Sequence, residues 1–189
     1  MNRYLKIPMS AAIAVAASAL AAVALAASTA DIDASVEATL SHFYAQSDGN
    51  QNLAQKASAV LVFPRVTKAG AGVGGEFGKG ALLVHGRTVG YYKVTGGSIG
   101  ATLGVAHHSE VILFMTDEAR DHFMHSSDWS IGADAGVAVV KKGAEAQYGT
   151  ETLHKPVLAF VFGEKGLMGD VSLAGAKVSK LPERQAQAQ

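Results

Sequence analysis

The sequence predicts an α+β fold: a curved, largely antiparallel β-sheet or barrel-like core with an N-terminal helix and one internal helix. Three observations support this class. Apolar residues near the N-terminus recur at helical spacing, and the middle of the chain carries several apolar or alternating stretches separated by glycines. One further helical segment lies between two of those stretches.

The first 26 residues have the features of a secretory signal peptide. Arg3 and Lys6 precede an alanine-rich apolar run that ends in small residues, so we expect cleavage after Ala26 or as late as Ala30. The mature protein would then be periplasmic or secreted. An uncleaved membrane anchor is the alternative.

The remaining chain is long enough for one domain with its own core. Removing residues 1–26 leaves about 163 of the 189 residues, which we expect to form a domain over 33–181 and a disordered tail over 182–189. Without Arg3 and Lys6, 14 basic residues face 16 acidic ones, and this net charge of −2 argues against nucleic-acid binding. Cysteine is absent, so disulfides and thiolate metal sites are excluded.

Residues 33–47 are expected to form the first helix, with Asp31 and Asp33 as capping residues. One apolar stripe is formed at i, i+4, i+7 and i+8 spacing by Val36, Leu40, Phe43 and Tyr44. The polar stretch 46–52 is expected to break this helix. A short second helix should then lead into an apolar strand that ends at Pro64.

Most of the remaining chain is predicted to be strand. Residues 81–94 have the pattern of a hairpin whose turn is His85–Arg87. Thr116, with the two acidic residues after it, is expected to cap the internal helix, which should end near His125. Further strands are expected in “WSIGADAGVAVV” (129–140), “VLAFVF” (157–162) and “DVSLAGAKV” (170–178).

The glycine-rich stretch 67–84 contains the G-x-G-x-x-G pattern of dinucleotide-binding sites at Gly70–Gly75. That fingerprint requires a helix directly after the glycines, whereas the residues that follow have the period of a strand and contain a turn. We therefore predict that the glycines at 70–80 lie in β structure. There they would allow close approach of a helix, another strand or a ligand.

Two other patterns bear on chemistry. Gly96–Gly100 matches the G-x-S-x-G motif of hydrolases, with Ser98 as the candidate nucleophile. A nucleophile elbow needs a helix after the serine, and the residues that follow are too rich in glycine to form one. A serine hydrolase is therefore an alternative function, and no catalytic residue is assigned. His122 and His125 lie three apart on the expected internal helix without further metal-binding motifs, so no metal or cofactor is predicted.

Five stretches, taken together and in order, resemble the SYLF domain family. They are “VLVFPRVTKAGAGVGGEFGKGALLV” (60–84), “GYYKVTGGSIGATLG” (90–104), “VILFMTDEARDHF” (111–123), “WSIGADAGVAVVKKG” (129–143) and “GEKGLMGDVSLAGAKVSKL” (163–181). The resemblance implies a non-catalytic domain of the bacterial cell envelope that binds lipid, either a phosphoinositide or another anionic phospholipid. Eukaryotic members are also associated with actin, which is not an expected partner outside the cell. No other protein partner is predicted.

Arg65, Lys68, Lys79 and Arg87 are the predicted contacts to a lipid headgroup. They cluster on the glycine-rich hairpin region, where missing side chains let backbone amides approach an anion. Ordinary solvated charges are the alternative for these four residues. The expected helix 33–47 carries no Lys or Arg, which weighs against phosphoinositide specificity. A structural envelope protein without a ligand is a third possible function.

Overall fold

The structure, a computed structural model, describes residues 29–131, 136–141, 154–166 and 175–182. Residues Ile32–Leu181 form one compact unit. The expected signal peptide, and all of the expected tail except Pro182, lie outside the described residues. Within the part of the chain that is described, no helix is long and apolar enough to cross a membrane.

The N-terminal helix covers residues 29–46 of the described chain. Its apolar stripe is buried as the spacing predicts: Val36 is 2% exposed and Phe43 is 0% exposed. The expectation that Asp31 and Asp33 cap this helix is wrong, because both residues lie inside it. Asp33 instead accepts hydrogen bonds from the side chains of Thr88 and Tyr91.

The polar stretch 46–52 breaks the N-terminal helix as expected, although the break is a single residue long. Only Ser47 lies outside a helix there, and it is the N-cap of α2 (Asp48–Lys56). The Ser47 side chain accepts a hydrogen bond from the backbone N–H of Gly49 at 3.2 Å. Serine, aspartate and glycine are common in turns and equally common at helix starts, and here they start a helix.

β1 (Ala59–Val84) and β2 (Arg87–Phe114) form one long antiparallel hairpin, in place of several shorter strands expected in this region. Its turn consists of His85 and Gly86, with φ angles of 50° and 75°. Two positive φ angles are typical of the two-residue turn that matches strand twist, so the predicted hairpin is confirmed. Pro64 does not end the strand as expected, because a β-bulge at this position carries β1 past it.

The other strands complete a curled, mostly antiparallel sheet. Its order is β3-β6-β2-β5-β4, with β1 paired to β2, and β4 and β5 run parallel. The bounds of the shorter strands are Trp129–Ser130 for β3, Val137–Lys141 for β4, Val157–Gly166 for β5 and Lys177–Lys180 for β6. Helix α3 (Asp117–His125) follows β2, and the Thr116 side chain accepts a hydrogen bond from the backbone N–H of Ala119 at 3.2 Å. The predicted α+β class, with an N-terminal and an internal helix, is confirmed.

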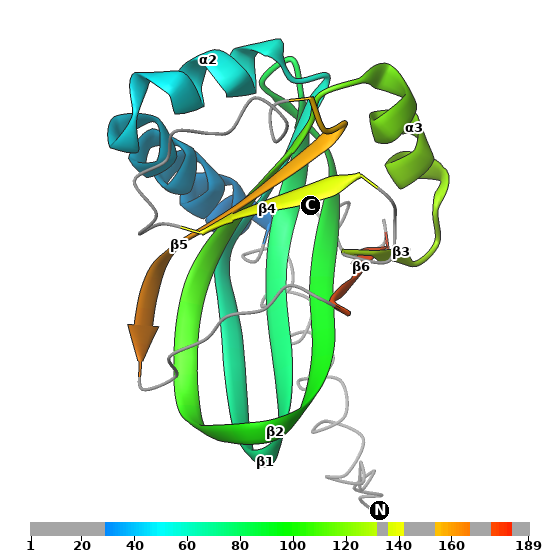
Figure 1. The fold of residues 1–189 in the computed structure, drawn as a ribbon. Helices are drawn as coiled ribbons and strands as arrows, with labels where there is room; N and C mark the ends of the chain where they lie inside the picture. Colours follow the sequence, from blue (N-terminus) through cyan, green and yellow to red (C-terminus); the bar gives the residue numbers. More distant parts are fainter. Residues whose placement is uncertain (1–28, 132–135, 142–153, 167–174, 183–189) are drawn as a thin grey trace, which may run out of the picture. The chain divides into compact units, whose positions relative to one another are not determined.

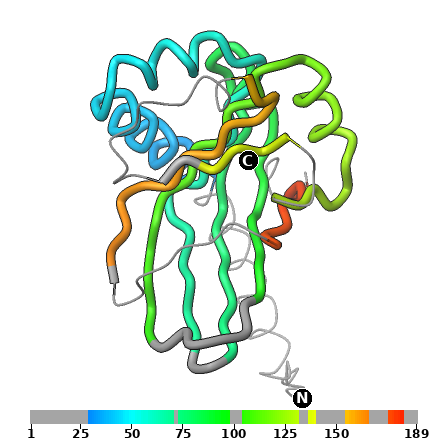
Figure 2. The backbone as a smooth tube through the Cα atoms, in the orientation of Figure 1, coloured from blue at the N-terminus to red at the C-terminus, as the bar shows by residue number. Residues whose placement is uncertain are grey.

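The long hairpin folds back, so that the second half of β1 lies beside the first half (Figures 1 and 2). Two glycines permit this approach. A Cβ atom on Gly80 would overlap the carbonyl oxygen of Val62, and one on Gly78 would lie 3.0 Å from the carbonyl oxygen of Arg65. The prediction that the glycines at 70–80 lie in β structure is confirmed, and the element that approaches them closely is another segment of the same strand.

Apolar side chains are buried on both faces of the sheet. One cluster includes Phe123 of α3 and Trp129 of β3, whose rings meet edge to face with centroids 5.4 Å apart. The second cluster lies under the N-terminal helix and α2 and includes Phe43. Because neighbouring strand residues face opposite sides, Ile112 belongs to the first cluster and Val111 to the second. We call the face that carries the first cluster the inner face and the other the outer face.

Candidate functional site

The four cations predicted to bind a headgroup do not share one face of the sheet. Lys68 is only 6% exposed, whereas Lys79 is exposed. Side chains of a strand alternate between its faces, so residues two positions apart share a face. Lys68 therefore lies on the inner face with Val66, and Lys79 lies on the outer face with Ala81.

The remaining two cations are exposed but lie apart from each other. The backbone of Arg65 lies against Gly78, next to Lys79. Arg87 follows the hairpin turn, pairs with Val84 and is eight residues from Lys79 along the chain. The role of these residues in binding a headgroup stays a prediction.

Lys93, which sequence reasoning missed, lies directly opposite Lys79 in the β1–β2 ladder. A regular ladder from the two-residue turn would place Tyr92 there, but a register shift between Leu82 and Leu83 brings Lys93 into that position. Like charges directly opposite each other destabilise a strand pair. Neither lysine forms an ion pair within the described part of the chain, so this location favours an anion.

A third cation and an exposed aromatic ring extend this location. Phe77 is 48% exposed and lies on the same face of β1 as Lys79, two residues away. In the next row of the sheet, Thr95 pairs with Phe77 on one side and with the exposed Lys177 of β6 on the other. We call Phe77, Lys79, Lys93 and Lys177 the hairpin surface.

Val73 adds apolar area farther along β1, with 69% of its surface exposed. The combination of exposed apolar side chains with nearby lysines is typical of surfaces that contact membranes. Glu76 lies two residues before Gly78 on β1 and therefore shares its inner face. Its charge is thus on the opposite side of the sheet from the hairpin surface.

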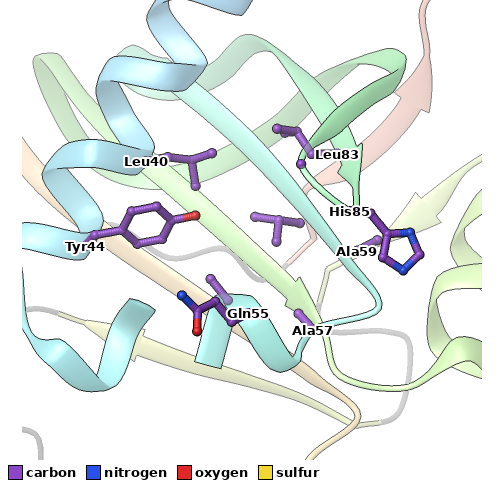
Figure 3. A pocket seen from close by; sticks show the side chains of 10 residues that line it. Leu40, Tyr44, Gln55, Ala57, Ala59, Leu83 and His85 are labelled. Carbon is purple, nitrogen blue, oxygen red and sulfur yellow. The ribbon is translucent and has the colours of Figure 1, made fainter. Parts of the chain in front are cut away.

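A separate cavity of about 310 Å³ lies between the helices and the hairpin turn (Figure 3). Its walls are mostly apolar and are formed by Leu40, Tyr44, Ala54, Gln55, Ala57, Ala59, Val60, Leu83, His85 and Gly86. The Tyr44 ring extends from the N-terminal helix toward the strands (Figure 3). Burial raises the pKa of Tyr44 above its ordinary value of 10.0.

Neither the G-x-S-x-G motif around Ser98 nor the pair His122 and His125 forms a catalytic or metal site in the described part of the chain. Ser98 lies within β2, which continues as a strand beyond it, so the strand–turn–helix of a nucleophile elbow does not form there. Gly96 of the same motif has a packing role, because a Cβ atom on it would lie 2.8 Å from Cγ of Glu76. His122 and His125 lie on α3, and the described part of the chain holds no group of three or more side chains that could bind a metal.

Residues 95–187 match the family model Ysc84, described as “Las17-binding protein actin regulator”. The matched region holds three of the stretches that carry the SYLF resemblance in full, namely 111–123, 129–143 and 163–181. A search of curated proteins finds no match to the chain.

Proposed function

We propose that this protein is a non-catalytic domain that binds anionic phospholipid at a membrane surface. Its residues 95–187 belong to the Ysc84 (SYLF) family. The observation that carries this proposal is the pairing of Lys79 with Lys93 beside the exposed Phe77. A lipid phosphate between two opposed lysines would remove their mutual repulsion. An aromatic side chain at the same place would enter the headgroup layer.

The expected strength of this contact follows from its parts. Each lysine near an anionic surface contributes about 1 kcal/mol, and full burial of a Phe side chain contributes about 1.5–3 kcal/mol. Loss of both Lys79 and Lys93 should therefore cost about 2 kcal/mol, which is roughly thirtyfold in affinity. Exchange for glutamate should cost more than that, because it adds repulsion.

Vesicle co-sedimentation tests the proposal. The variant Lys79→Glu/Lys93→Glu should bind phosphatidylglycerol-containing vesicles at least about thirtyfold more weakly than the wild type. The matched control Lys155→Glu/Lys165→Glu changes the net charge equally at exposed positions outside the hairpin surface, and it should bind nearly as the wild type does. Equal losses in both variants would show that net charge alone is responsible. If the wild type does not bind these vesicles, the proposal is wrong. A protein partner, of the kind that the family description names, would then be favoured.

The apolar part of the contact has its own pair of variants. Phe77→Ser should weaken binding to the same vesicles, because an exposed ring that enters the headgroup layer is lost. Val89→Ser is the control, since Val89 is 46% exposed, close to the 48% of Phe77, but lies near the hairpin turn. Equal effects of the two substitutions would contradict a role of Phe77.

The place of action is part of the proposal. We infer that the domain works in the bacterial cell envelope after removal of residues 1–26, in line with the basic head and apolar run of the N-terminus. Cell fractionation followed by N-terminal sequencing tests this. A protein in the envelope fraction that starts between Ala27 and Asp31 supports export with cleavage, whereas one that retains Met1 supports an anchor.

A further inference from the structure

A cleft beside α3 shares no residue with the hairpin surface or with the cavity of Figure 3. One wall is formed by α3 and its N-cap, and the other by the first residues of β3, β4 and β5. We call it the α3 cleft. Its volume of about 250 Å³ lies below the volume of about 300 Å³ at which sites for drug-sized ligands begin, so the cleft suits a small ligand.

Most of the α3 cleft is apolar and has a tryptophan in its wall. The apolar lining residues are Ala119, Trp129, Val137, Pro156 and Val157. The ring of Trp129 is held in place by Phe114 and Phe123, whose ring centroids lie 5.8 Å and 5.4 Å from it. An indole ring packs against apolar groups and also attracts a cation that lies within about 6 Å of its centroid.

The polar lining residues come from α3 and its N-cap. The hydroxyl oxygen of Thr116 already accepts a hydrogen bond from the backbone N–H of Ala119. Glu118 and His122 lie one turn apart and are both exposed. Glu118 is the only acidic residue of the lining, and its carboxylate forms no ion pair or hydrogen bond with any residue that the structure describes.

The basic residues near the cleft do not neutralise Glu118. Arg120 is paired with Asp117 at 2.8 Å and with Asp121 at 2.9 Å. Lys155 is not a lining residue and forms no ion pair with Glu118. The formal charge that the cleft itself presents is therefore negative when its histidine is neutral, and it is complementary to a cation.

We propose that the α3 cleft binds a small organic ammonium ion, whose apolar part contacts Trp129 and whose charge lies beside Glu118. An organic anion of the same size would be repelled by the carboxylate. Because the cleft has no residue in common with the hairpin surface, this proposal is independent of membrane binding. Lys79→Glu/Lys93→Glu should therefore bind an ammonium probe as the wild type does.

Fluorescence titration with three probes that share one ring tests the sign of the ligand. Trp129 is the only tryptophan of the chain, so its emission reports directly on the cleft. At mildly alkaline pH, where imidazoles carry no charge, benzylammonium should change this emission saturably. Benzoate should bind at least about tenfold more weakly. Benzyl alcohol should bind only about threefold more weakly, because an exposed ion pair contributes little. No saturable change with benzylammonium, or equal binding of the three probes, would overturn the proposal.

Neutralising Glu118 tests its part in this preference. Glu118→Gln should bind benzylammonium and benzyl alcohol about equally, and folding should be unaffected because the side chain is exposed. Glu37→Gln makes the same change in net charge at an exposed position of the N-terminal helix and should keep the preference of the wild type. Equal losses of preference in the two variants would show that net charge is responsible and would contradict the assignment of Glu118.

Filling the cleft tests its location. Ala119→Leu places a larger side chain into the cleft and should weaken benzylammonium binding by at least about tenfold, as measured by calorimetry. Ala38→Leu, at an exposed position of the N-terminal helix, should bind the probe normally. Circular dichroism and thermal unfolding show whether Ala119→Leu folds, and Glu118→Gln decides the matter if it does not. Normal binding by folded Ala119→Leu would place the ammonium ion elsewhere and overturn the assignment.

Discussion

His108 Nε2 lies 2.7 Å from Glu110 Oε1, and both side chains are fully excluded from solvent. The two residues are two apart on β2 and share its inner face. Within the described part of the chain, His108 Nδ1 and Glu110 Oε2 have no hydrogen-bond partner. Both groups, together with the buried Lys68, act electrostatically on Glu76. Four ionisable side chains thus meet on the inner face of the folded hairpin.

Replacement of Glu110 alone should destabilise the domain strongly. Glu110→Leu would leave His108 buried without its partner, and breaking a buried pair from one side costs about 3–5 kcal/mol. The double variant His108→Leu/Glu110→Leu removes both polar groups and should lose less stability than Glu110→Leu alone. Urea unfolding of the wild type, the two single variants and the double variant gives the coupling energy. A double variant whose loss equals the sum of the single losses would show that the two residues are not coupled.

The free energy of unfolding should depend on pH through the ionisation of Glu76. Burial, and after it the charge of Glu110, raises the pKa of Glu76 above its ordinary value of 4.5, although His108 and Lys68 act in the opposite direction. A carboxyl whose pKa is raised by folding binds its proton more tightly in the folded state. Its stabilising contribution is therefore present below pH 4.5 and is lost as the pH rises through the raised pKa.

The variant Glu76→Gln checks this sign, because glutamine resembles the protonated acid. It should be more stable than the wild type at neutral pH, and the difference should vanish as the pH falls below 4.5. Glu164→Gln, an exposed position on β5, is the matched control and should show no such trend. A difference for Glu76→Gln that stays constant between acidic and neutral pH would argue against a raised pKa as the cause.

Local sequence signals located most elements of the fold. The spacing from Val36 to Phe43, the turn at His85–Gly86 and the cap at Thr116 each depend on a few neighbouring residues, and all three occur. Ser47 shows where such signals are ambiguous, since its neighbours suit a turn and a helix start equally. A contact across the junction resolves the ambiguity: the side-chain amide of the buried Asn50 donates a hydrogen bond to the carbonyl oxygen of Phe43 at 2.9 Å.

The hairpin surface depends on pairing that local signals do not determine. A register shift of one residue decides whether Tyr92 or Lys93 lies opposite Lys79, and Lys177 joins from a strand almost a hundred residues away. The inward direction of Lys68 could have been predicted, because it follows from the period of a strand. The sequence therefore predicts one of the three lysines of this surface and none of the pairings that bring them together.

Gly80→Ala should be strongly destabilising. A Cβ atom at this position would overlap the carbonyl oxygen of Val62 and lie 2.7 Å from Cδ1 of Phe63. A clash with backbone cannot be relieved by a rotamer change, so we expect a loss of about 3 kcal/mol in urea unfolding. Gly97→Ala is the control, because a Cβ atom there would meet no atom within 4 Å. Equal losses for the two variants would contradict the close approach of the two halves of β1.

The N-terminal helix should depend on Asp33 for its attachment to the hairpin. Its carboxylate accepts hydrogen bonds from Tyr91 and Thr88, and burial, together with Asp33, raises the pKa of Tyr91 to about 12. Asp33→Ala should cost about 1–2 kcal/mol and should lower the pKa of Tyr91 toward its ordinary value of 10.0. Asp31→Ala, an exposed position of the same helix, is the control.

Absorbance titration of the tyrosines measures this effect. Because the folded-state pKa of Tyr91 is raised, its contribution to stability is present below pH 10 and is lost as the pH rises toward 12. Hydrogen exchange of the helix amides should accelerate in Asp33→Ala and remain unchanged in Asp31→Ala. An unaltered tyrosine titration in Asp33→Ala would show that burial alone raises the pKa of Tyr91.

Salt should weaken the binding of anionic vesicles only in part. The three lysines of the hairpin surface act through charge, which is screened over about 10 Å at 0.1 M salt and about 3 Å at 1 M salt. Insertion of Phe77 and Val73 is apolar and is not screened. High salt should therefore remove at most the lysine contribution, about 3 kcal/mol for three residues, and leave the apolar part.

Variants should distinguish the contribution of the lysine charges to vesicle binding from that of the apolar side chains. Lys79→Glu/Lys93→Glu should lose most of the salt dependence of vesicle binding, because little attraction remains to be screened. Phe77→Ser should keep the salt dependence but lose much of the binding that persists at 1 M salt, because the apolar anchor is missing. Co-sedimentation at both salt concentrations measures the two terms in the same vesicles. If 1 M salt abolishes binding of the wild type, the contact is electrostatic alone. If the lysine variant keeps the full salt dependence, other cations of the chain bind the membrane.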